Sequence, residues 1–111
     1  MNPDLIYNQM VGNLTQSTSR ALWEEVTFNT NQVTSIDWVT YPILRFKDSP
    51  ALTTVLVQRT DQPSLGSGEP VTCPTIGAIA NAFFDATGVR IHEAPMTPGR
   101  VRATLKAAGV S

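Results

Sequence analysis

The sequence predicts an α+β domain in which helices pack on a mixed β-sheet of about four strands, in the order α-β-β-β-α-β-α. Three segments carry apolar residues at helical spacing, which predicts amphipathic helices. The runs between them are rich in β-branched residues and alternate with polar ones, which is typical of strands. The chain has 111 residues, which predicts a single domain over residues 1–111.

The first predicted helix covers residues 3–23. Asn2 is a good N-cap and Pro3 suits the first turn. The stretch "GNLTQSTS" in its middle is polar and small. Such a face either lets another backbone or a ligand come close, or is simply solvated, and composition does not choose between the two.

Two further helices are predicted in the second half of the chain. Residues 74–87 begin at Pro74 and stop before Gly88, the usual placement of these two residue types. The last helix has Thr97 as N-cap and Pro98 in its first turn, and it stops at Gly109.

The predicted strands lie between these helices. Residues 24–29 and 32–37 alternate apolar and polar side chains around the turn sequence "NTNQ", which predicts a hairpin. The run "ALTTVLVQRT", residues 51–60, predicts a third strand, and "VRIHEAP", residues 89–95, predicts a short fourth one.

Composition excludes several classes of protein. The net charge is −1 and the eight basic residues are mostly scattered, so no nucleic-acid partner is expected. The single cysteine excludes an internal disulfide, and no apolar run approaches the ~20 residues that span a membrane. No signal peptide follows Met1, so the chain as given is expected in the cytoplasm unless a partner carries it elsewhere.

Glu69, in the loop "SLGSGEP", is the sharpest candidate for a functional residue. Gly66 and Gly68 allow backbone angles closed to other residues, and Pro70 favours an extended conformation at Glu69. The acid also precedes a predicted helix N-terminus, where negative charge is favoured. It is therefore either an acid aimed at a ligand or a loop glutamate that caps and solvates the helix start.

The remaining chemically active residues suggest no second site. His92 is the only histidine and is far in sequence from Cys73, so no metal-binding spacing exists. Cys73 is expected to be a small packed residue. Glu24 and Glu25 would point to opposite faces of a strand, which does not suit paired carboxylates. The larger aromatic residues are expected in a core or an interface: Trp23, Trp38, Tyr41 and Phe46.

Several blocks of the sequence resemble a known family in matching order. They are "NPDLIYNQMVGNLTQSTSRALWEEVTF", "VTSIDWVTYPILRF", "GSGEP" and "PTIGAIANAFFDATGVRIHEAPMTP". Together they resemble the C-terminal part of the molybdopterin-binding (large or beta) subunit of molybdenum hydroxylases, the xanthine dehydrogenase and aldehyde oxidase superfamily. The segment "GNLTQSTSRAL" is most similar to the bacterial branch that includes isoquinoline 1-oxidoreductase beta subunits and the corresponding subunit of nicotinate dehydrogenase.

The resemblance implies roles for three residues. Glu69 matches the family's catalytic glutamate, which takes up a proton during hydroxylation of an N-heterocycle or an aldehyde. Gln9 matches a glutamine that touches the molybdopterin cofactor, and Gly68 is expected to allow its close approach. The complete enzyme would contain molybdopterin and molybdenum, the rest of the large subunit and an iron–sulfur subunit. The isolated chain is expected to be inactive, with no cofactor and no metal ligands.

Two alternatives to the enzyme part stay open from the sequence. The chain is also compatible with a non-catalytic interaction module, or a truncated remnant of the fold, in which case uncovered apolar patches are expected to drive homo-oligomerisation. An unrelated small α+β binding domain is the third hypothesis.

Overall fold

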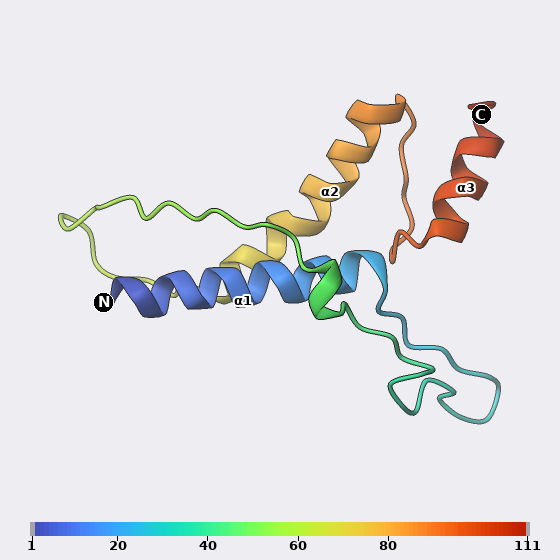
Figure 1. Cartoon of the computed structure of the whole chain (residues 1–111), viewed down its shortest axis with the longest axis horizontal. Coiled ribbons are helices and arrows are strands. Elements are labelled where there is room, and N and C mark those ends of the chain that lie inside the picture. The colour runs from blue at the N-terminus through green and yellow to red at the C-terminus, as the bar shows by residue number, and fades with distance from the viewer. Residues whose placement is uncertain (1, 111) are drawn as a thin grey trace.

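The computed structural model describes residues 2–110 and consists of three α-helices joined by long irregular segments (Figure 1). Helix α1 spans Pro3–Leu22, α2 spans Thr72–Thr87 and α3 spans Pro98–Ala107. Two short 3₁₀ turns complete the elements, η1 at Phe46–Asp48 and η2 at Glu69–Val71.

Local capping signals explain where the helices begin and end. The Asn2 side chain accepts hydrogen bonds from the backbone N–H groups of Asp4 and Leu5, which satisfies two free donors at the start of α1. Thr97 caps α3 in the same way. Gly88 ends α2 with a left-handed φ of 70°, a conformation that favours glycine. The predicted helices are thus confirmed to within two residues, except that η2 extends the start of α2.

The predicted four-stranded sheet is wrong. Within residues 2–110 the only β pairing is one isolated antiparallel bridge between Phe28 and Val33. The segments at 51–60 and 89–95 form no ladder with any described part of the chain. Their strand-forming composition is real, but a β-strand needs a partner to hydrogen-bond with, and the described chain supplies none.

The core is small for a chain of this length. Ala21, Ile91 and Met96 are buried, and the Met96 N–H donates a 2.7 Å hydrogen bond to the Ala21 carbonyl. Five partly buried residues pack around them: Leu22, Ile79, Ala80, Phe83 and Val101. The radius of gyration is 17.2 Å, whereas a compact domain of this length has one of about 13 Å. The chain is therefore an open structure.

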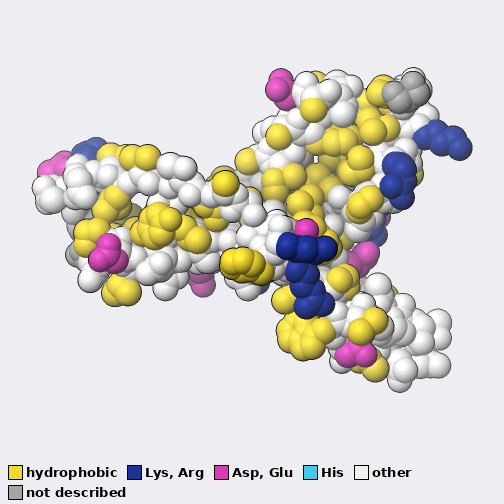
Figure 2. Space-filling model, viewed as in Figure 1, with side chains coloured by type: hydrophobic (Ala, Val, Ile, Leu, Met, Phe, Trp, Pro, Cys, Tyr) yellow, Lys and Arg dark blue, Asp and Glu magenta, His cyan; other side chains and the backbone are white. Residues whose placement is uncertain are grey.

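Apolar side chains are spread over the surface of this open structure (Figure 2). Phe46 is 98% exposed and Trp38 is 67% exposed, so these two aromatic residues do not lie in the core, and their place in an interface stays a prediction. Most of the exposed large apolar residues belong to the segment between α1 and η2. No helix among residues 2–110 is long and apolar enough to cross a membrane.

Arg100 fastens α3 to the rest of the molecule. Its guanidinium forms ion pairs with Glu25 at 2.7 Å and Glu93 at 2.8 Å, and it donates a hydrogen bond to the Pro95 carbonyl. The Arg100 hydrogen bond holds the pKa of the Glu25 carboxyl below its usual range. Glu24 bonds instead to Tyr41, so the two adjacent acids do point to different partners.

Candidate functional site

Glu69 is held in a well-defined turn just before α2. The Val71 N–H donates to the Gly68 carbonyl at 3.1 Å, and the Thr72 hydroxyl donates to the Glu69 carbonyl at 2.7 Å. Glu69 thus begins a 3₁₀ turn, and the expectation that Pro70 makes it extended is wrong. Proline is well tolerated in the first turn of a helix, and here it fixes that turn.

Gly68 packs the loop directly against α1. A Cβ atom at Gly68 would stand 3.0 Å from Gln9 Oε1 and 3.2 Å from Asn13 Nδ2. Its φ of −79° is open to any residue, so the tight space beside α1, and not the backbone angle, favours glycine here. The Gln9 and Asn13 side chains can therefore lie against the loop backbone.

Gln9 and Glu69 line the same surface hollow, named here the glycine-loop hollow. Its volume is about 580 Å³, and it is lined by Gln9, Asn13, Gly66, Ser67, Gly68, Glu69 and Pro70. The three residues to which the family resemblance implies catalytic and cofactor-binding roles thus come together, although Gln9 and Glu69 are far apart in the sequence. Their roles stay predictions.

A second hollow adjoins the first and shares Asn13, Glu69 and Pro70 with it. This arginine hollow has a volume of about 770 Å³, and its other lining residues are Gln16, Arg20, Thr72 and Cys73. Cys73 is exposed, so the expectation that it is packed is wrong. Within residues 2–110 Glu69 forms no ion pair with Arg20 or any other basic residue.

The lining suits a flat cofactor rich in nitrogen and oxygen. The Asn13 side-chain amide donates a 2.9 Å hydrogen bond to the backbone carbonyl of Gln9. The Gln9 side-chain carboxamide offers both a donor and an acceptor. Gly68 lacks a Cβ, which lets the Gln9 and Asn13 side chains lie against the loop backbone. A cofactor such as a pterin, with ring-edge donors and acceptors, fits these groups.

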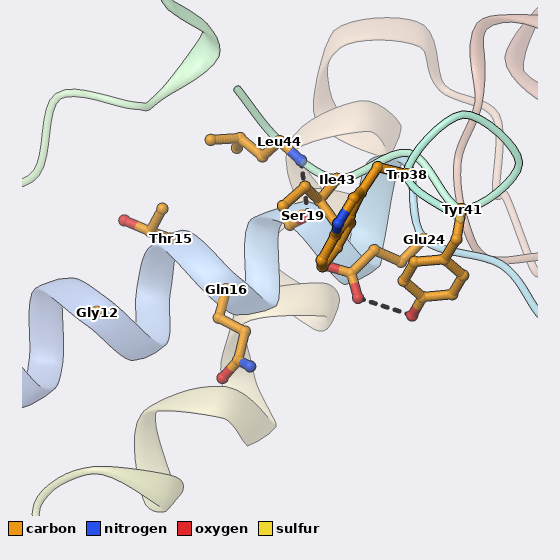
Figure 3. A pocket seen from close by; sticks show the side chains of 9 residues that line it. All are labelled: Gly12, Thr15, Gln16, Ser19, Glu24, Trp38, Tyr41, Ile43 and Leu44. Atoms are coloured by element: carbon orange, nitrogen blue, oxygen red, sulfur yellow. Dashed lines mark hydrogen bonds between the residues drawn. The ribbon is translucent and has the colours of Figure 1, made fainter. Parts of the chain in front are cut away.

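A third hollow lies toward the other end of α1 (Figure 3). Trp38 and Tyr41 face the helix there, and the Tyr41 hydroxyl donates a 2.9 Å hydrogen bond to Glu24. This bond raises the pKa of the Tyr41 phenol. Gln16 also lines this hollow, but its side chain points toward the segment that leads into α2. The third hollow therefore offers an aromatic surface, and the one acid in its lining, Glu24, is bonded to Tyr41.

Three lining residues on α1 were not identified from the sequence: Asn13, Gln16 and Arg20. Counted from Gln9, they recur at intervals of three or four positions, which places them on one face of α1. That spacing could have identified them once Gln9 was chosen. His92 lies elsewhere, exposed beside Glu93 in a separate hollow, and takes no part in this site.

Comparison with known proteins gives consistent matches. A nicotinate dehydrogenase subunit of Pseudomonas putida is 47% identical over 109 residues, which cover 98% of this chain and 9% of that protein. The beta subunit of isoquinoline 1-oxidoreductase of Brevundimonas diminuta is 34% identical, over 86% of this chain and 12% of that one. No protein-family model matches the chain.

A solved structure has the same fold. The Cu,Mo-CO dehydrogenase aligns with a TM-score of 0.79 at 19% identity, over 98% of this chain and 15% of the matched one. The open arrangement of helices and loops therefore also occurs as a small part of a much longer polypeptide.

These matches define the class: the chain belongs to the molybdenum hydroxylases and corresponds to a segment of their large, molybdenum-binding subunit. Within that family its relatives include the nicotinate dehydrogenase subunit and the isoquinoline 1-oxidoreductase beta subunit, so the resemblance described from the sequence is confirmed. The chain spans about a tenth of the length of these two curated relatives.

Proposed function

We propose that this chain supplies the catalytic glutamate, Glu69, to a molybdenum-cofactor-dependent oxidoreductase that hydroxylates an N-heterocycle or an aldehyde. The observation that carries this proposal is the glycine-loop hollow, which brings Glu69 together with Gln9 and Gly68. The relatives named after nicotinate and isoquinoline support the substrate class.

Glu69 acts as the general base in this proposal. Its side chain is exposed and has no hydrogen-bond or ion-pair partner within residues 2–110, so its oxygens are available to accept a proton. The η2 turn fixes the backbone on either side, which limits the directions the carboxylate can take. A positioned base of this kind contributes roughly 10²–10⁴-fold to a rate.

Gln9 and Gly68 hold the cofactor in this proposal. The Gln9 carboxamide pairs with a donor and an acceptor on the cofactor edge, and the lack of a Cβ at Gly68 lets that carboxamide lie against the loop. When bound, the molybdenum cofactor supplies the oxygen atom and accepts two electrons from the substrate.

Other polypeptide completes the site. Both hollows next to Glu69 are open, and the described chain places nothing on their far side. We propose that the remaining part of the large subunit closes them, that an iron–sulfur subunit receives the electrons, and that the chain alone neither retains molybdenum nor turns over substrate.

A chimeric enzyme tests this proposal. In it, this chain replaces the matching 109 residues of the nicotinate dehydrogenase subunit from Pseudomonas putida. Glu69→Gln keeps the size of the side chain and removes the base. We expect dye-coupled turnover of nicotinate to fall by about 10²-fold or more, with molybdenum content unchanged.

Asp85→Asn is the matched control, because Asp85 is an exposed acid on α2 that lines none of the three hollows around α1. Its turnover should equal that of the unmodified chimera. Equal turnover in Glu69→Gln would remove Glu69 from the mechanism.

A non-catalytic interaction module is the second candidate, and the exposed apolar residues between α1 and η2 favour it. In that case the chimera would bind its partners but show no turnover even with Glu69 intact.

A further inference from the structure

Residues 51–58 have the features of a β-strand without a partner. None of their backbone N–H or C=O groups is hydrogen-bonded within residues 2–110, and the neighbouring bonds stop at Ser49 and resume at Arg59. The segment is nevertheless extended and rich in β-branched residues. An extended segment with free backbone groups on both edges is a template for strand pairing.

Side-chain exposure alternates between higher and lower values over residues 51–57. Val55 is 77% exposed and Val57 is 75% exposed, while Leu56 between them is 40% exposed. Leu52 and Thr54 are also partly buried. One face of the segment is therefore directed toward the molecule and the other carries apolar residues outward, as in a strand at the edge of a sheet.

The position of the segment is fixed at both ends. Before it, the Leu44 N–H donates a 2.9 Å hydrogen bond to the Ser19 hydroxyl near the end of α1. After it, Gly68 lies against Gln9 near the start of α1. The chain thus runs back along the helix toward its N-terminus (Figure 1). The segment therefore lies between two points that are anchored on α1, and the second of them is next to Glu69.

We propose that residues 51–58 add as a β-strand to a sheet formed by the remaining part of the large subunit, and that this pairing positions the Glu69 loop. This inference rests on the proposed function, because it names the partner of the same site. The same open fold occurs as 15% of a solved chain, so most of that chain lies outside this fold and can supply a partner strand. The partner strand must place apolar side chains against Val55 and Val57.

Hydrogen exchange in the chimera described above tests the pairing, with amides of residues 51–58 resolved individually. In the isolated chain these amides should exchange at the rate of an unstructured peptide. In the chimera we expect amide exchange to slow by about 10²-fold or more. If the strand is paired along one edge, alternate amides should be slowed, and if it is paired along both edges, all of them should be. Unslowed exchange would overturn the proposal. Slowing in the isolated chain together with dimer formation would also overturn it, because the partner would then be a second copy.

Proline variants separate backbone pairing from side-chain contact. Val55→Pro and Leu56→Pro remove N–H groups that point to opposite edges of the strand, and at least one should abolish the slowing. Val55→Thr keeps the N–H and nearly the same shape, and should preserve it. Helical circular dichroism checks that α1 and α2 are intact in each variant. If both proline variants keep the slowed exchange of the unmodified chimera, strand addition is contradicted.

This test is independent of the catalytic assignment. Glu69→Gln should leave the slowed exchange at residues 51–58 intact even where turnover is lost. Failure of the pairing and failure of the proposed base would therefore be seen in different measurements.

Discussion

Gly68 lies so close to Gln9 that a single methyl group at Gly68 would stand 3.0 Å from the Gln9 side-chain oxygen. This contact joins the loop that carries Glu69 to the first helix. A substitution at Gly68 therefore tests the site without replacing Gln9 or Glu69.

We expect Gly68→Ala to change stability little and to lower activity. The Gln9 amide is the end of a flexible, exposed side chain, so it can move aside, and the φ of −79° suits alanine. Unfolding free energy should stay within about 1 kcal/mol of the unmodified chain. Turnover of the chimera should fall because the Gln9 carboxamide is displaced. Unchanged turnover would show that this amide is not needed where it lies.

Gly77→Ala serves as the matched control for Gly68→Ala. A Cβ at Gly77, inside α2, meets nothing within 4 Å. The substitution should raise the free energy of unfolding by about 0.5–1 kcal/mol, because alanine is favoured over glycine in a helix. Turnover should not change.

Two neighbouring buried serines should respond in opposite ways to replacement by alanine. The Ser17 hydroxyl is buried with no hydrogen-bond partner within residues 2–110, so Ser17→Ala should leave stability unchanged or raise it by about 1 kcal/mol. The Ser19 hydroxyl accepts the Leu44 N–H, so Ser19→Ala leaves that donor unpaired and should cost about 1–3 kcal/mol. Urea denaturation measures both. A larger loss for Ser17→Ala would mean that its hydroxyl is bonded in solution.

Arg100 should make stability dependent on pH through Glu25. The pKa of Glu25 is lower in the folded chain than its usual value of 4.5. The ionised Glu25 therefore stabilises the fold above pH 4.5, and this stabilisation is lost as the pH falls through the lowered pKa. The stability difference between the unmodified chain and Glu25→Gln should therefore shrink as the pH falls below 4.5. Urea midpoints across this range measure it. A difference that is constant with pH would contradict the ion pair.

Tyr41 should titrate above its usual pKa of 10, because ionising its hydroxyl breaks the hydrogen bond to Glu24. This bond stabilises the fold below pH 10 and is lost as the pH rises through the raised pKa. The chain has two tyrosines, so Tyr7→Phe leaves Tyr41 alone in an ultraviolet titration. Adding Glu24→Gln should bring the midpoint back toward 10. A midpoint that does not move would show that the bond is absent in solution.

The helices could be predicted from the sequence because their signals are local. Asn2 and Thr97 cap the helices that follow them, and Gly88 ends α2. The sheet could not be predicted because β pairing is not local. Residues 51–60 have strand-forming composition, but pairing depends on a second strand that no property of the segment itself guarantees.

Only some of the residues of the candidate site were identified from the sequence. Glu69 was chosen from its loop sequence and Gln9 from the family resemblance, since the long stretch between them carries no local sign that the two meet. Arg20 was missed although it shares a helix face with Gln9. The glycine at position 68 was attributed to backbone angle and to close approach of the cofactor, whereas its φ is ordinary and its tight contacts are with the side chains of α1.

The most direct measurement of the central claim is the rate at which nicotinate reduces the chimeric enzyme in a single turnover, before any electron acceptor is added. With Glu69→Gln and equal molybdenum content, this rate should fall by about 10²–10⁴-fold, because the chemical step loses its base. A rate equal to that of the unmodified chimera would contradict the assignment of Glu69 as the catalytic glutamate.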